Sequence, residues 1–147
     1  MNTSAPTQRN PKRVAVIPGD GIGREVVPEA VRILRAAIAK ANRQAEFVEF
    51  DWGAERFLRD GTTLPADAVE MFRREFDAIL FGAVGDPRVP SNRHAADILL
   101  GLRAKLDLYV NARPVELLDA SLTPLRDRSE EEIRFVIFRE NTEGLYA

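Results

Sequence analysis

Apolar and polar positions follow two periods along this chain, one typical of strands and one typical of helices. Short apolar runs rich in β-branched or aromatic residues predict strands at 14–17, 45–52, 77–84, 108–112 and 133–138. Apolar residues at helical spacing predict helices at 24–42, 65–75 and 94–106. Segment 53–64 shows neither period clearly and is expected to be loop-like or mixed.

The alternation of strands and helices predicts an α/β protein, a layered and largely parallel sheet with flanking helices. Residues 1–11 are polar and are expected to form a flexible tail, and 129–132 a solvated charged turn. The chain stops a few residues after its last predicted strand, with no closing helix, and we expect it to be truncated.

Composition removes several classes of site. There is no Cys, so disulfides, thiolate catalysis and Cys-based zinc sites are excluded, and a single His94 excludes a multi-His metal site. The formal net charge of −2 gives no general reason to bind nucleic acid or an anionic membrane. The N-terminus lacks a signal-peptide pattern and no apolar run is long enough to span a bilayer, so a cytoplasmic location is expected.

The first candidate for chemistry is the turn at 17–23, Ile-Pro-Gly-Asp-Gly-Ile-Gly, between a predicted strand and a predicted helix. Helix N-termini favour anions, and glycines let a ligand approach the backbone. The spacing fails both the Rossmann fingerprint and the Walker A pattern. By spacing alone a tight turn is the favoured interpretation, and a phosphate-binding α/β module is the alternative.

Three arginines form the second candidate. Arg103 lies in a leucine-rich helix, whereas Arg113 and Arg139 are expected at or just past the ends of predicted strands. Taken singly, each is an ordinary surface charge. Ligands in α/β proteins bind near strand ends, and Arg suits bidentate recognition of carboxylates, so together they indicate an acidic ligand.

Four segments then carry a resemblance. They are PGDGIG at 18–23, GAVGDP at 82–87, LLGLRAKLDLYVNARPV at 99–115 and RENTEGLY at 139–146. In this order they resemble the isocitrate/isopropylmalate dehydrogenases, a family of β-decarboxylating dehydrogenases, over about residues 12–147. The resemblance implies that family's fold, which is not a Rossmann fold. It also implies that the chain is the N-terminal portion, with 12–108 belonging to the cofactor-side domain and 109–147 beginning the second domain.

The resemblance further implies NAD-dependent oxidative decarboxylation of a 3-substituted malate, with Mg²⁺ or Mn²⁺, by a homodimer. The implied substrate-binding residues are Arg103, Arg113, Arg139, Leu99 and Leu100, and Tyr146 is the implied catalytic proton donor. The implied cofactor-binding residues are Ile22, Gly82, Val84 and Gly85. The implied metal ligands lie beyond residue 147, so we expect no metal site within the chain and no activity from the chain alone.

The segment before Arg103 selects the substrate in this family. Leu99 and Leu100 resemble an apolar pair that meets an isopropyl group, which favours 3-isopropylmalate and a role in leucine biosynthesis. Asp97 would face a third carboxylate unfavourably. Thr142-Glu143-Gly144 is commoner in the isocitrate and tartrate types, so tartrate/malate, homoisocitrate or isocitrate remain alternatives, as does a non-catalytic fragment.

Overall fold

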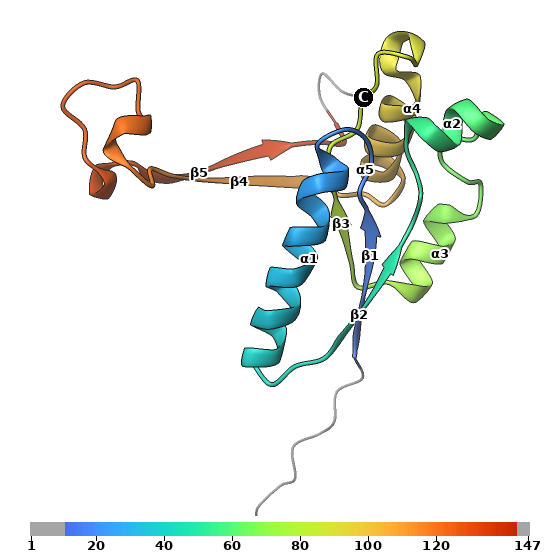
Figure 1. The fold of residues 1–147 in the computed structure, drawn as a ribbon, viewed down its shortest axis with the longest axis horizontal. Coiled ribbons are helices and arrows are strands. Elements are labelled where there is room, and N and C mark those ends of the chain that lie inside the picture. The colour runs from blue at the N-terminus through green and yellow to red at the C-terminus, as the bar shows by residue number, and fades with distance from the viewer. Residues whose placement is uncertain (1–10, 144–147) are drawn as a thin grey trace, which may run out of the picture. The chain divides into compact units, whose positions relative to one another are not determined.

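A computed structural model describes residues 11–143 of the chain (Figure 1). These residues divide into two compact units, one ending at Gly101 and the other beginning at Leu102. The predicted domain boundary between 108 and 109 stays a prediction.

The first unit contains three strands and the helices that connect them. In chain order its elements are β1 (Lys12–Ile17), α1 (Gly23–Lys40), β2 (Ala45–Glu49), α2 (Ala54–Asp60), α3 (Ala68–Glu75), β3 (Ala78–Phe81), η1 (Pro90–Asn92), α4 (Arg93–Ala95) and the π-helix η2 (Ala96–Leu100). The predicted strands and helices of this part are confirmed with shifted ends. The expectation for 53–64 was incomplete, because α2 occupies more than half of it.

The three strands form a parallel sheet in the order β2-β1-β3. The chain therefore leaves β1 toward one edge, and then crosses back over β1 to reach the other. Because such crossovers are right-handed, the two connections put their helices on opposite faces, and Figure 1 shows α1 and α3 on either side of the sheet. The predicted α/β fold with a parallel sheet and flanking helices is confirmed.

The core of the first unit is built from the central strand and the helix faces turned toward it. Ile17 and Ile98 are completely buried. An aromatic cluster joins the segment after β2 to α3, where the rings of Phe50 and Phe72 meet edge-on with centroids 5.4 Å apart, and Trp52 packs against both. This packing fixes the C-terminal edge of the sheet, where the loops discussed below begin.

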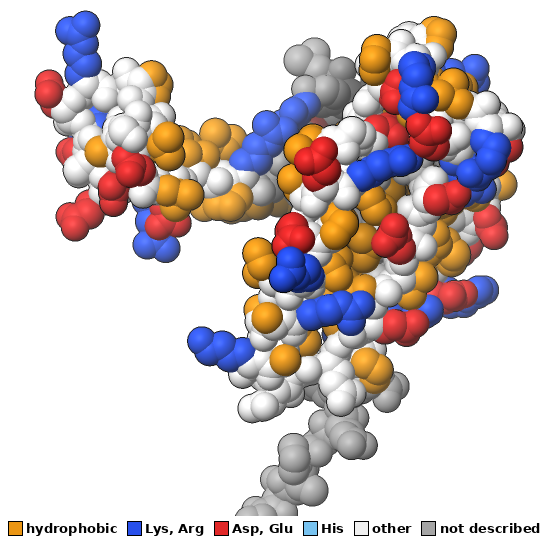
Figure 2. Space-filling model, in the orientation of Figure 1, with side chains coloured by type: hydrophobic (Ala, Val, Ile, Leu, Met, Phe, Trp, Pro, Cys, Tyr) orange, Lys and Arg blue, Asp and Glu red, His pale blue; other side chains and the backbone are white. Residues whose placement is uncertain are grey.

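The second unit is an antiparallel hairpin preceded by a short helix. Its elements are α5 (Gly101–Lys105), β4 (Val110–Glu116), η3 (Ala120–Leu122), η4 (Glu130–Glu132) and β5 (Arg134–Glu140). Its apolar side chains remain largely exposed, and Figure 2 shows them along the hairpin. No helix within residues 11–143 is both long and apolar enough to cross a membrane.

The expected position of Arg113 at a strand end was wrong, because β4 continues through it to Glu116. Pro114 pairs with Val136 within the ladder. A proline is tolerated there because β4 has a partner on one side only within the described residues, so the missing N–H costs no ladder hydrogen bond. Arg139 likewise lies inside β5, one residue before its end.

Candidate functional site

Two glycine-rich loops leave the sheet next to each other. Loop 18–23 follows β1, loop 82–87 follows β3, and β1 and β3 are hydrogen-bonded neighbours. Because β1 and β3 are parallel, both loops emerge at the C-terminal ends of their strands. Open α/β sheets bind ligands outside the carboxyl ends of their strands. The two loops are therefore the candidate cofactor side of the site.

Glycines let the two loops touch backbone to backbone. The Asp20 N–H donates to the Ala83 carbonyl oxygen (N···O 2.7 Å). A Cβ on Gly19 would overlap that same oxygen, and a Cβ on Gly82 would overlap the Pro18 carbonyl oxygen. Gly21, by contrast, has nothing within 4 Å of its Cβ position. Close packing thus explains Gly19 and Gly82, while Gly21 faces open space.

The start of α1 offers few amides to an anion. Its first N–H groups already donate within the turn, from Gly23 to Asp20, from Arg24 to Gly21 and from Glu25 to Ile22 (N···O 2.9–3.1 Å). Glu25 also places a carboxylate in the first turn. Anion sites at helix N-termini depend on free N–H groups and positive potential. The local geometry therefore does not favour the phosphate-binding alternative.

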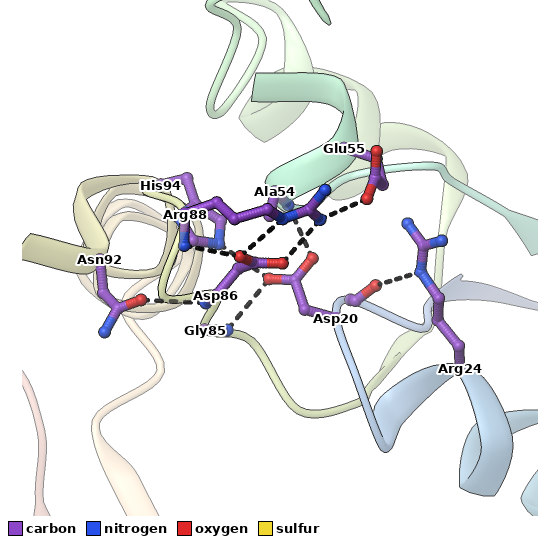
Figure 3. Close-up of polar contacts among 10 residues, drawn as sticks. Asp20, Arg24, Ala54, Glu55, Gly85, Asp86, Arg88, Asn92 and His94 are labelled. Atoms are coloured by element: carbon purple, nitrogen blue, oxygen red, sulfur yellow. Dashed lines mark hydrogen bonds and ion pairs between the residues drawn. The ribbon is translucent and has the colours of Figure 1, made fainter. Parts of the chain in front are cut away.

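A buried carboxylate joins both loops to the rest of the unit. Asp20 is 4% exposed, and it accepts the Ala54 N–H on Oδ1 (2.7 Å) and the Gly85 N–H on Oδ2 (3.0 Å). The same Oδ2 is hydrogen-bonded to His94 Nε2 (2.8 Å). Figure 3 shows these groups converging on it from three segments of the chain. Buried charges persist only with such partners. Asp20 thus ties the second loop and the start of α2 to the first loop.

A second, exposed cluster borders this one. Arg88 pairs with both Asp86 and Glu55, as Figure 3 shows. Side-chain and backbone hydrogen bonds from Arg88 hold the pKa of the Asp86 carboxyl at about 2, and the Asp86 and Glu55 carboxylates raise the pKa of the Arg88 guanidinium. The Asp86 N–H in turn donates to Asn92 Oδ1 (3.0 Å). The second loop is thereby linked to α2 and to the segment before α4.

The predicted cofactor residues all lie on these two loops. Ile22 is 58% exposed at the start of α1, Val84 is half-buried and Gly85 is exposed. Gly82 differs, because it is packed against Pro18. Apolar side chains beside accessible backbone are typical of the lining of a small-molecule site. Ile22, Val84 and Gly85 are therefore available to a ligand, whereas Gly82 serves the packing of the loops.

The helix expected at 94–106 is observed as α4, η2 and α5, with a π-turn at Ala96–Leu100. Ile98 and Leu102 are buried, Leu99 is half-buried and Leu100 is 54% exposed. A π-turn adds one residue to a helical turn, and such turns frequently mark functional sites. The predicted substrate-selecting leucines thus fall on the distorted turn, and Leu100 is open to solvent.

Arg113 and Arg139 share one face of the hairpin. The strand register pairs Asn111 with Arg139 and Arg113 with Ile137. Paired residues of an antiparallel ladder point to the same face, as do residues two apart on one strand. Arg113 and Arg139 therefore occupy diagonal positions, roughly 7–8 Å apart at the backbone. Two guanidiniums that start from one face of a hairpin can together bind an anion with more than one negative oxygen.

Arg103 lies in α5, next to the same end of the hairpin. Its carbonyl oxygen accepts the Leu108 N–H (2.9 Å), and the Asn141 N–H after β5 donates to the Tyr109 carbonyl oxygen (3.0 Å). The turn between α5 and β4 is thus hydrogen-bonded both to Arg103 in α5 and to Asn141 after β5. Tyr146 lies outside the described residues.

Asn111 orients Arg113. Its Oδ1 accepts from Arg113 Nε (3.0 Å), and its Nδ2 donates to Asn141 Oδ1 (3.3 Å). The sequence motif contained this residue but gave it no role.

Asp20 and His94 were also given no role by the sequence analysis, although one signal was present for Asp20, a carboxylate inside a glycine-rich turn. Within residues 11–143, no three His, Asp or Glu side chains gather to hold a metal ion.

Comparison with known proteins gives one family. The family model described as isocitrate/isopropylmalate dehydrogenase matches residues 13–147. A 3-isopropylmalate dehydrogenase of Corynebacterium kroppenstedtii is 48% identical over 92% of this chain and 39% of its own length. A tartrate dehydrogenase/decarboxylase of Pseudomonas putida is 44% identical over 92% of this chain and 37% of its own.

A solved structure is also similar to this chain in fold and in sequence. The β-decarboxylating dehydrogenase of Thermococcus kodakarensis superposes with a TM-score of 0.66 at 36% identity, covering 91% of this chain and 35% of that one. The chain spans somewhat more than a third of the length of these relatives.

Proposed function

Because this chain belongs to the isocitrate/isopropylmalate dehydrogenase family, we propose that it forms part of an NAD-dependent dehydrogenase that oxidatively decarboxylates a 3-substituted malate. The observation that carries the proposal is the position of the two glycine-rich loops, side by side at the C-terminal ends of the neighbouring strands β1 and β3. The favoured substrate is 3-isopropylmalate, in leucine biosynthesis. The whole enzyme is proposed to be a cytoplasmic homodimer.

Each proposed role rests on a local feature. The cofactor nicotinamide lies against Ile22, Val84 and Gly85, with Gly82 allowing the loops to meet. The guanidiniums of Arg113 and Arg139, with Arg103 beside them, bind the substrate carboxylates in the bidentate manner that suits Arg. Leu99 and the exposed Leu100 meet the apolar substituent, where each buried methylene adds about 0.8 kcal/mol.

The chemistry divides between the cofactor and the chain. NAD⁺, when bound, accepts the hydride from the 2-hydroxyl carbon. The hydroxyl proton is released, the bond to the departing carboxylate breaks to give CO₂, and Tyr146 protonates the carbon left behind. An ordinary tyrosine has a pKa near 10, so a neighbouring cation is required to make it an effective acid–base group near neutral pH. The whole enzyme is proposed to use Mg²⁺ or Mn²⁺, for which residues 11–143 gather no set of three carboxylate or histidine ligands.

Substrate binding by the purified chain tests the arginine roles. We expect calorimetric titration with 3-isopropylmalate to show binding that falls at least about tenfold in Arg113→Met and in Arg139→Met, since each removes a charge-assisted hydrogen bond of about 1.5–3 kcal/mol. Arg128→Met, on the exposed segment before η4, is the matched control and should bind like the unchanged chain. Equal binding by all four proteins would overturn the assignment.

The same titration separates the candidate substrates. Tartrate is the second candidate, because the Pseudomonas putida relative is nearly as similar as the isopropylmalate enzymes, and because a glutamate at the position of Glu143 is commoner in the isocitrate and tartrate types. Leu100→Ser should weaken 3-isopropylmalate and leave tartrate unchanged if the isopropyl group meets this residue. Tighter binding of tartrate than of 3-isopropylmalate by the unchanged chain would favour the tartrate type.

The chain alone is expected to form no NADH from 3-isopropylmalate. Metal ligands and a second subunit are part of the proposed whole enzyme. A steady-state absorbance assay with Mg²⁺ or Mn²⁺ checks this, and NADH formation by the 147 residues would contradict it.

A further inference from the structure

His94 is the only histidine of the chain, and its side chain is completely buried. Its Nε2 lies 2.8 Å from Oδ2 of Asp20, and its ring stacks on Phe57 with centroids 6.1 Å apart. Both Asp20 oxygens already accept backbone N–H groups. A carboxyl group whose two oxygens both accept acts as the acceptor for the ring as well, which assigns the hydrogen of this bond to Nε2 of His94.

The other ring nitrogen shows why a histidine is an unusual choice here. Nδ1 of His94 has no hydrogen-bond partner among the described residues. A buried polar atom without a partner costs free energy, and an apolar side chain of similar size would avoid that cost. The benefit must therefore come from the single bond that the ring does make, the one to Asp20.

The bond between His94 and Asp20 affects the part of loop 82–87 that has the fewest backbone hydrogen bonds. Up to Ala83 the loop is held by backbone hydrogen bonds to β1 and the first loop, through Ile17 and Asp20. Beyond it, side chains hold the loop: Asp20 accepts the Gly85 N–H and Asn92 accepts the Asp86 N–H. Gly85 is exposed and has no atom within 3.4 Å of its Cβ position. Its place depends on where the Asp20 carboxylate points.

We propose that His94 is a positioning residue, which holds the Asp20 carboxylate so that Gly85 is kept against loop 18–23 at the nicotinamide side of the site. The inference rests on the proposed function for its link to the cofactor, and on the geometry alone for its link to Gly85. His94 itself touches neither cofactor nor substrate in this scheme. The path runs from Nε2 to Asp20 Oδ2 and on to the Gly85 N–H (Figure 3).

Three substitutions of His94 distinguish the effect of its hydrogen bond from the effect of the space that its ring fills. In His94→Gln the amide nitrogen reaches about as far as Nε2, in His94→Asn it reaches only as far as Nδ1, and His94→Leu fills the space without a donor. Amide hydrogen exchange of Gly85, followed by NMR, is the readout. The Phe50 N–H, which donates to Val16 in the sheet (2.8 Å), reports whether the fold is intact. We expect Gly85 to exchange about tenfold faster in the Asn and Leu variants and near the original rate in the Gln variant. Unchanged exchange in the Asn and Leu variants would overturn the proposal.

A measurement on the unchanged chain keeps the proposal falsifiable if the variants do not fold. Because there is one imidazole, its two nitrogen-15 signals need no assignment to a residue, and their different couplings to the ring C–H hydrogens distinguish Nε2 from Nδ1. The hydrogen should be found on Nε2, protected from exchange with water. A hydrogen on Nδ1 alone would refute the proposed donor.

Titration with NADH, followed by its fluorescence, tests the link to the cofactor separately. The dissociation constant should rise about tenfold in His94→Asn and His94→Leu and recover in His94→Gln. If the unchanged chain does not bind NADH, the proposed cofactor side fails while the exchange data still decide the positioning role. If Gly85 loosens and NADH affinity does not change, the link to the cofactor is refuted.

Discussion

The two units of this chain cover their strands differently. In the first unit, β1 lies between two other strands and beneath helices, and Ala15, Val16 and Ile17 are at most 3% exposed. In the second, Phe135, Val136, Ile137 and Phe138 of β5 are each about half exposed or more, although they alternate between the two faces of the hairpin. Within the described residues, neither face of the hairpin is well covered.

This difference shows that the apolar pattern of a strand indicates whether one or both of its faces are to be buried. Alternating polar and apolar residues suit a sheet with one wet face, whereas an uninterrupted apolar run is typical of a strand buried on both faces. Both β1 and β5 carry such runs, VAVI and FVIF. The first unit supplies the cover that its run requires, and residues 102–143 do not. A lone two-stranded hairpin is marginally stable in water.

The largest difference in unfolding free energy is expected when a phenylalanine ring is removed from each unit in turn. Phe72→Ala empties a site that is 3% exposed, and should lower the free energy of unfolding by about 3–5 kcal/mol. Phe138→Ala acts on a side chain that is 72% exposed, and should cost less than about 1 kcal/mol. Urea unfolding followed by far-ultraviolet circular dichroism reports both units. A cost at Phe138 equal to that at Phe72 would mean that the hairpin is covered after all.

The next effect tests the close contact between the two loops. Gly19 and Gly61 share a φ of +75°, but a Cβ on Gly19 would overlap the Ala83 carbonyl oxygen whereas one on Gly61 would meet nothing. Gly61→Ala should cost only the left-handed backbone strain, about 1–2 kcal/mol. Gly19→Ala adds overpacking of about 1–3 kcal/mol, for a total of about 2–5 kcal/mol. Fluorescence of Trp52, the one tryptophan, follows unfolding of this unit. Equal costs would show that the loops separate easily.

Local sequence patterns predicted most of the first unit because its strands are short apolar runs and its long helix has one apolar face. They missed α2 for a physical reason. That helix begins at Ala54, whose N–H donates to Asp20, a residue 34 positions earlier in the chain. A helix stabilised by so distant a partner leaves little trace in its own sequence, although Gly61, at its left-handed C-cap, marks its end.

In both units the sequence predicted which segments form the candidate site, but not which of their residues lie together. The motifs identified the loops and the three arginines, but the register that brings Arg113 and Arg139 to one face could not be read from either strand alone. The bond between Asp20 and His94 joins residues 74 positions apart. No periodicity predicts such a contact, so His94 entered the sequence analysis only as an argument against a metal site.

A smaller effect concerns acid titration on the exposed side of the loops. Hydrogen bonds from Arg88 lower the pKa of Asp86 to about 2. Because the folded pKa is lower than the ordinary value of 3.8, the stabilisation is present above pH 4 and is lost as the pH falls toward 2. In Arg88→Met the pKa of Asp86 should rise part of the way toward its ordinary value, since the backbone N–H of residue 88 remains.

Carboxyl carbon NMR across pH 2–6 measures this shift. Asp119 in the second unit is the internal control, because its pKa is lowered by Ser121 and not by an arginine. It should titrate identically in both proteins. A parallel shift at Asp119 would indicate a general loss of structure instead of a lost contact.

The smallest effect sharpens the basis of the comparison. The first unit carries most of the ion pairs of the described residues, so two features distinguish it from the second unit, burial and charge pairing. Arg32 and Glu29 pair on the outer face of α1, and their side chains are 76% and 62% exposed. Exposed pairs of this kind contribute little because water screens them, so Arg32→Ala should change the free energy of unfolding by less than about 0.5 kcal/mol. Urea unfolding followed by Trp52 fluorescence measures it, and a cost as large as that of Gly61→Ala would mean that surface charge, and not cover over the strands, separates the two units.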